Sequence, residues 1–120
     1  MIEELTFIVR TPSNKPELAD VRYDCPCGCK PHARFKKGTS EVGHEHCCCG
    51  RVHFAGEGAE VHLKQYLAER DSQGIDKDVE GYQITALNMD APWGGKVEIA
   101  YAIPNVLKKH AEEAHDHHGA

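Results

Sequence analysis

Six cysteines stand in two short groups whose spacing suits a metal ion. All 6 Cys of the 120-residue chain lie between positions 25 and 49, within the segments 25–29 and 47–49. Two Cys-x-Cys-Gly units, each a chelating pair, can together supply the four thiolates of a tetrahedral zinc site. The glycine after each pair permits a positive φ where the backbone folds around a metal. The pattern predicts one Zn²⁺ held by Cys25, Cys27, Cys47 and Cys49.

Two cysteines and several histidines remain beside these four ligands. In an extended chain Cys29 shares a face with Cys25 and Cys27, whereas Cys48 points to the side opposite Cys47. Additional metal ligands could come from Cys29, Cys48, His32, His44, His46 and His53. The number of bound metal ions is accordingly one or two.

The softness of the ligands indicates which metals such a site would select. Thiolate-dominated tetrahedral sites bind Zn²⁺, Cu(I) or iron–sulfur clusters, and the nearby histidines favour Zn²⁺. A protein that handles or senses Cu(I), Hg²⁺ or Cd²⁺ would use the same tight Cys-x-Cys groups, so this alternative stays open. So does a zinc-dependent enzyme, because a catalytic zinc ion keeps one coordination position open.

The cysteine-bearing segment is positively charged within an acidic chain. Residues 22–51 hold 6 basic and 3 acidic residues, whereas the whole chain has a formal net charge of −5. A Zn²⁺ ion with four thiolates is negatively charged, so nearby basic side chains should offset it. The candidates are Lys30, Arg34, Lys36, Lys37 and Arg51. The overall charge disfavours nucleic-acid binding.

A local resemblance accompanies the second cysteine group. The stretch Cys-Cys-Cys-Gly-Arg-Val-His-Phe at residues 47–54 resembles the first ligand motif of the zinc-binding family that includes glutathione-dependent formaldehyde-activating enzymes. That family continues with further cysteines downstream, whereas this chain has none after Cys49. The resemblance covers eight residues, and no function is carried over from it.

The hydrophobic pattern indicates the elements that position the cysteines. Alternation predicts strands at 4–10, 82–87 and 96–103, the last two forming a hairpin around a Pro-Trp-Gly-Gly turn. Apolar residues at helical spacing predict a helix at about 59–71. A final helix is expected after Pro104, with an apolar stripe formed by Val106, Leu107, His110, Ala111 and Ala114.

These elements predict a single α+β domain over residues 1–120. Its small antiparallel sheet would carry two helices, with a Cys-rich zinc-binding β-ribbon inserted at about 22–55. We expect a structural four-cysteine site in a binding or interaction domain. The acidic N-terminus and the lack of a long apolar run predict a cytoplasmic protein without a membrane span. Exposed hairpin edges could pair two copies into a homodimer.

Overall fold

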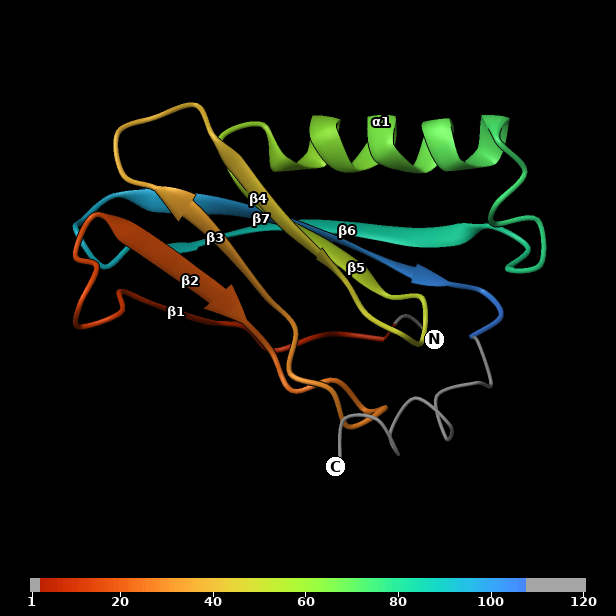
Figure 1. Cartoon of the computed structure of the whole chain (residues 1–120), viewed down its shortest axis with the longest axis horizontal. Helices are drawn as coiled ribbons and strands as arrows, with labels where there is room; N and C mark the ends of the chain where they lie inside the picture. The colour runs from red at the N-terminus through yellow and green to blue at the C-terminus, as the bar shows by residue number, and fades with distance from the viewer. Residues whose placement is uncertain (1–2, 108–120) are drawn as a thin grey trace.

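A computed structural model of the chain describes residues 3–107, which form two antiparallel sheets and one helix. The helix covers one face of the four-stranded sheet, and the three-stranded sheet packs on its other face (Figure 1). In chain order the elements are β1 (Ile8–Arg10), β2 (Leu18–Arg22), β3 (His32–Lys36), β4 (Val42–His46), β5 (Val52–Gly56), α1 (Ala59–Ser72), β6 (Tyr82–Asp90) and β7 (Lys96–Pro104).

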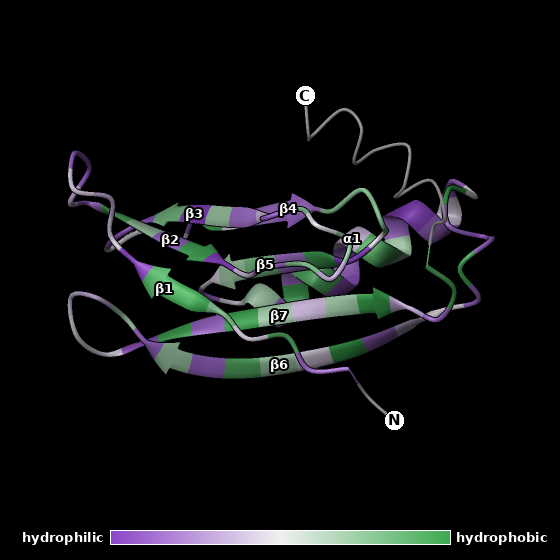
Figure 2. Cartoon of the chain, turned by 90° about the horizontal axis from the view of Figure 1, so that it is seen from below, coloured by the Kyte–Doolittle hydropathy of each residue, from purple (hydrophilic) through white to green (hydrophobic). Residues whose placement is uncertain are grey.

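The four-stranded sheet has the order β4-β5-β7-β6, with all neighbours antiparallel. Every residue of β5 is buried, because this strand lies inside the sheet and both of its faces are covered. The predicted hairpin of residues 82–103 is confirmed as β6 and β7. Hydrophobic and hydrophilic residues alternate along much of β6, which is one of the two edge strands of this sheet (Figure 2). A homodimer formed through such edges stays a prediction.

The helix predicted at 59–71 is confirmed as α1, and it packs through one apolar stripe. Ala59, Leu63 and Leu67 are its buried residues. They contact side chains on one face of the sheet, among them Phe54 and Ala100. The helix thereby holds β5 and β7 in place from the side opposite the three-stranded sheet.

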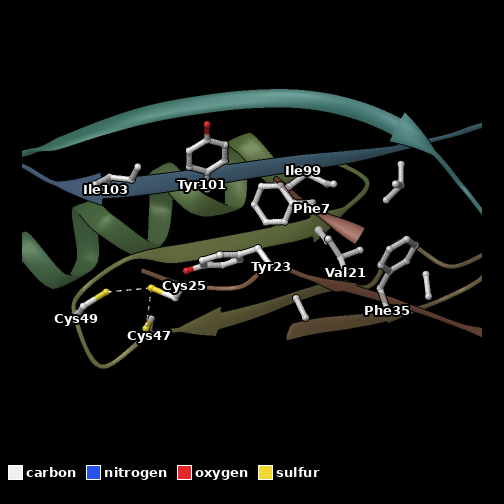
Figure 3. Packing of buried hydrophobic residues seen from close by; sticks show 14 residues of the cluster. Phe7, Val21, Tyr23, Cys25, Phe35, Cys47, Cys49, Ile99, Tyr101 and Ile103 are labelled. Atoms are coloured by element: carbon white, nitrogen blue, oxygen red, sulfur yellow. Dashed lines mark hydrogen bonds between the residues drawn. The ribbon is translucent and has the colours of Figure 1, made fainter. Parts of the chain in front are cut away.

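The larger core lies between the two sheets. Figure 3 shows Phe7, Val21 and Tyr23 facing Ile99 and Tyr101 of β7. The three-stranded sheet has the order β1-β2-β3, and alternate residues of β2 and β3 belong to this core, namely Ala19, Val21, Ala33 and Phe35. Tyr23 continues from β2 toward the cysteine segment, so the core reaches the cysteines directly.

Three expectations differ from the observed fold. The first strand pairs with β2 and not with the C-terminal hairpin, so there are two sheets instead of one. The Cys-rich segment is not an inserted ribbon, because its strand β5 pairs directly with β7. Pro104 ends β7 and starts no helix among the described residues. Most of the predicted final helix, including His110, Ala111 and Ala114, lies outside the described residues. Within residues 3–107, no helix is long and apolar enough to cross a membrane.

A glycine near the start of β4 allows the two sheets to approach each other. Gly43 of β4 lies so close to β3 that a Cβ atom there would overlap the backbone carbonyl of Arg34. Strands β3 and β4 follow each other in the chain but belong to different sheets. The missing side chain therefore permits the close contact that aligns the two hairpins β2–β3 and β4–β5.

Candidate metal centre

The two cysteine groups form matching turns at the tips of the hairpins β2–β3 and β4–β5. In the first turn the N–H of Cys25 donates to the Cys29 carbonyl at 2.9 Å, and the N–H of Gly28 donates to Cys25 at 2.9 Å. In the second turn Cys47 donates to Arg51 at 2.7 Å, and Gly50 donates to Cys47 at 2.9 Å. The two glycines have φ values of 101° and 107°. The predicted positive φ after each cysteine pair is confirmed, and the turns are built alike.

The turns face each other and bring the predicted ligands together. The ligand atoms of Cys25, Cys27, Cys47 and Cys49 all lie within 4.8 Å of one another, and we call them the inner group. The sulfur of Cys25 is 3.6 Å from that of Cys49, and the sulfurs of Cys27 and Cys47 are 3.2 Å apart. Figure 3 shows three of these residues at one end of the core. This cluster could hold a metal ion.

A second set of thiols overlaps the first. Cys27, Cys29, Cys47 and Cys48 also lie within ligating distance of one another, and we call them the outer group. The sulfur of Cys29 is 3.4 Å from that of Cys48. Cys47 is buried, whereas the other three are partly exposed and border the solvent side of the cluster. All six cysteines therefore belong to one continuous thiol cluster.

A buried arginine contacts the inner group. Arg51 is only 3 % exposed, and its Nη1 donates to the sulfurs of Cys49 at 3.1 Å and Cys25 at 3.5 Å. Its Nε and Nη2 donate to both carboxylate oxygens of Glu3 at 2.8 and 2.7 Å. Hydrogen bonding from Cys25 is the main cause that holds the pKa of Cys49 below its usual range, and Arg51 adds to it. The site thus favours an ionised sulfur at Cys49.

The other expected basic residues have different roles. Arg34 pairs with Asp20 at 3.4 Å, and the ammonium of Lys37 lies 5.8 Å from the centre of the Trp93 ring. The role of the Glu3 carboxylate could not be predicted from the sequence, because Glu3 lies 48 residues from Arg51 and no local pattern links the two. Of the expected counter-charges, Arg51 is the one with a described contact to the thiols.

A tyrosine hydroxyl supplies an independent test of whether the cluster suits thiolates. The Oη of Tyr23 is buried without a hydrogen-bond partner among residues 3–107, and it points toward Cys25 (Figure 3). Burial, followed by the negative charge of nearby cysteines, raises the pKa of this hydroxyl far above its usual range. The hydroxyl therefore keeps its proton and can donate to a metal-bound thiolate, as groups around metal ligands commonly do.

The histidines lie beside the thiols but in other environments. The Nδ1 of His32 is 2.9 Å from Asp20, and the Nδ1 of His46 is 2.8 Å from the hydroxyl of Tyr66. His44 stacks on the Phe54 ring at a centroid distance of 4.8 Å. His53 is fully buried in β5. Within residues 3–107, both groups of candidate ligands contain cysteines alone, so no histidine joins them.

Comparisons with known proteins found no matching family, and neither a similar curated protein nor a similar solved structure.

Proposed function

We propose that this protein is a zinc-binding protein in which one Zn²⁺ at the inner group fastens the tips of two hairpins. The observation that carries the proposal is the convergence of four thiols, two from each tip, within 4.8 Å. Three of these cysteines are at most 5 % exposed and form part of the hydrophobic core. A metal ion there would link the three-stranded sheet to the four-stranded sheet and stabilise the domain for binding or interaction.

A structural role is favoured over a catalytic one by the composition of the inner group. Four thiolates complete a tetrahedral zinc shell, whereas catalytic zinc sites use three protein ligands and leave the fourth position to water. Burial of Cys25 and Cys49 beside Arg51 also separates that side of the site from solvent. Among metals suited to thiolates, we favour Zn²⁺ because it prefers a closed tetrahedral shell and has no redox chemistry.

Metal removal tests this proposal. Protein purified without added metal should contain zinc, and a strong chelator should lower the free energy of unfolding by at least about 3 kcal/mol. Re-addition of Zn²⁺ should restore the thermal midpoint, while Mg²⁺, which prefers oxygen ligands, should not. Loss of the metal without any change in thermal unfolding would contradict the structural role.

A second candidate function is the handling or sensing of soft metals such as Cu(I). It is supported by the partly exposed thiols of Cys27, Cys29 and Cys48, which give incoming metal a path from solvent. Thiolates prefer Cu(I) and Cd²⁺ as well as Zn²⁺. This function predicts that Cu(I) displaces bound zinc readily and that the protein passes the metal to a competing thiol. Slow exchange and retention of zinc under the same conditions would favour the structural role.

A further inference from the structure

The six thiols form three facing pairs that run in order from the core to the surface. Each pair joins one residue of the first turn to one residue of the second. From inside to outside the pairs are Cys25–Cys49, Cys27–Cys47 and Cys29–Cys48, with sulfur separations of 3.6, 3.2 and 3.4 Å. The middle pair belongs to both the inner and the outer group. Two tetrahedral sites that share one edge have this arrangement of six ligands.

We infer that the cluster holds two divalent metal ions, each bound by four thiolates, with the sulfurs of Cys27 and Cys47 bridging the two ions. This inference rests on the proposed zinc site at the inner group and adds a second ion at the outer group. Cys25 and Cys49 are the terminal ligands of the inner ion. Cys29 and Cys48 are the terminal ligands of the outer ion, which accounts for the two cysteines that a single site leaves over.

The sulfur separations match the size of such a cluster. With Zn–S bonds of about 2.3 Å, the sulfurs of a regular tetrahedron are about 3.8 Å apart. The sulfur contacts shorter than 4.0 Å run from 3.2 Å for the middle pair to 3.9 Å between Cys27 and Cys48, and all sulfurs within each group lie within 4.8 Å of one another. The middle pair is the shortest of the three facing pairs. A short shared edge is expected in a two-metal cluster, because bridging anions draw together to shield the two cations from each other.

The charge balance also allows the second ion. The second ion brings two positive charges, and its two terminal thiolates, Cys29 and Cys48, bring two negative charges. The net charge of the cluster is therefore that of one ion with four thiolates, and Arg51 already lies against it. The outer side borders a surface hollow lined by both Lys30 and Glu45, so the hollow itself adds no net charge to the balance.

A histidine is the alternative ligand for an outer ion, and the geometry favours the thiols. His32 and His46 border the same hollow. Their Nδ1 atoms lie within hydrogen-bonding distance of Asp20 and of the Tyr66 hydroxyl. The outer group has four sulfurs within reach of one ion without either ring. A mixed site would have to replace a thiol that is already in position.

Metal stoichiometry and cadmium NMR of the intact chain test the inference. Reduced protein saturated with Cd²⁺ should retain two ions per chain by native mass spectrometry. The spectrum should contain two cadmium signals that are coupled to each other through bridging sulfur. The double variant C29S/C48S should retain one ion and give one signal. The matched control H32Q/H46Q should retain two coupled ions, because it alters the hollow and spares the thiols.

The outcomes separate this inference from the proposed function. One ion per wild-type chain, with Cys29 and Cys48 still open to alkylation, would overturn the two-metal cluster. The proposed structural Zn²⁺ at the inner group would then remain supported. Two ions without coupling, or two ions in C29S/C48S, would place the second ion elsewhere and also overturn it. Absence of bound metal would overturn both proposals. The wild-type coupling decides the question even where a variant fails to fold.

Discussion

The buried histidine of β5 should make the stability of this protein sensitive to mild acid. His53 is fully buried, and its Nε2 donates to the carbonyl of Val21 at 2.9 Å. Its Nδ1 is buried without a hydrogen-bond partner among residues 3–107, and its ring contacts the rings of Phe7 and Tyr23. Protonation of Nδ1 would place an unpaired charge in the core. Burial accordingly lowers the pKa of His53 from 6.5 to about 4.

The size of the effect follows from the difference between the two pKa values. Between pH 4 and 6.5 the unfolded chain binds a proton at this site that the folded chain does not, so stability falls as the pH falls. At about pH 5 the loss relative to about pH 8 is about 2 kcal/mol, and it approaches about 3 kcal/mol below the folded pKa. Above the unfolded pKa the contribution of this histidine is constant.

Urea unfolding followed by circular dichroism, with metal kept saturating, would measure this loss. His53→Gln keeps an N–H donor for Val21 and removes the titrating group, so about 2 kcal/mol of the pH dependence should disappear. Release of metal in acid lowers the stability of the variant and of the wild type alike. It therefore cancels when the pH dependence of the variant is subtracted from that of the wild type. His62→Gln, which removes an exposed histidine of α1, is the matched control and should keep the wild-type dependence. Equal losses in His53→Gln and wild type would refute the reasoning.

Two further substitutions test the contacts around the cluster. Arg51→Met removes the donor to two sulfurs and should lower metal affinity at least about 10-fold and stability by about 3 kcal/mol. Chelator competition and urea unfolding would measure both, with exposed Lys64→Met as a control that changes little; unaltered affinity would count against a role for Arg51. Gly43→Ala should lose about 2 kcal/mol or more through overlap with the Arg34 carbonyl, measured by thermal unfolding. Gly38→Ala, in open space at a positive φ, should lose about 1 kcal/mol, and an equal effect at both glycines would argue against the close approach of β3 and β4.

The local features of the site could be predicted from the sequence because short-range rules determine them. A Cys-x-Cys-Gly unit closes its own turn through hydrogen bonds between near neighbours, and the glycine accepts the positive φ. The spacing of hydrophobic residues in α1 and in the β6–β7 hairpin likewise reflects which residues share a face of the element. These elements and the two Cys-x-Cys-Gly turns were therefore predicted at nearly their observed places.

The tertiary structure decided what those elements do together. Spacing alone could not show that Cys27 faces Cys47, that Glu3 reaches Arg51, or that His53 is enclosed between two sheets. These contacts arise because both faces of the four-stranded sheet bury apolar side chains, one against α1 and the other against β1–β3. Burial in three layers depends on residues far apart in the chain. The sequence by itself determined the two cysteine groups and their turns, and the packing of the sheets decided how the six thiols meet.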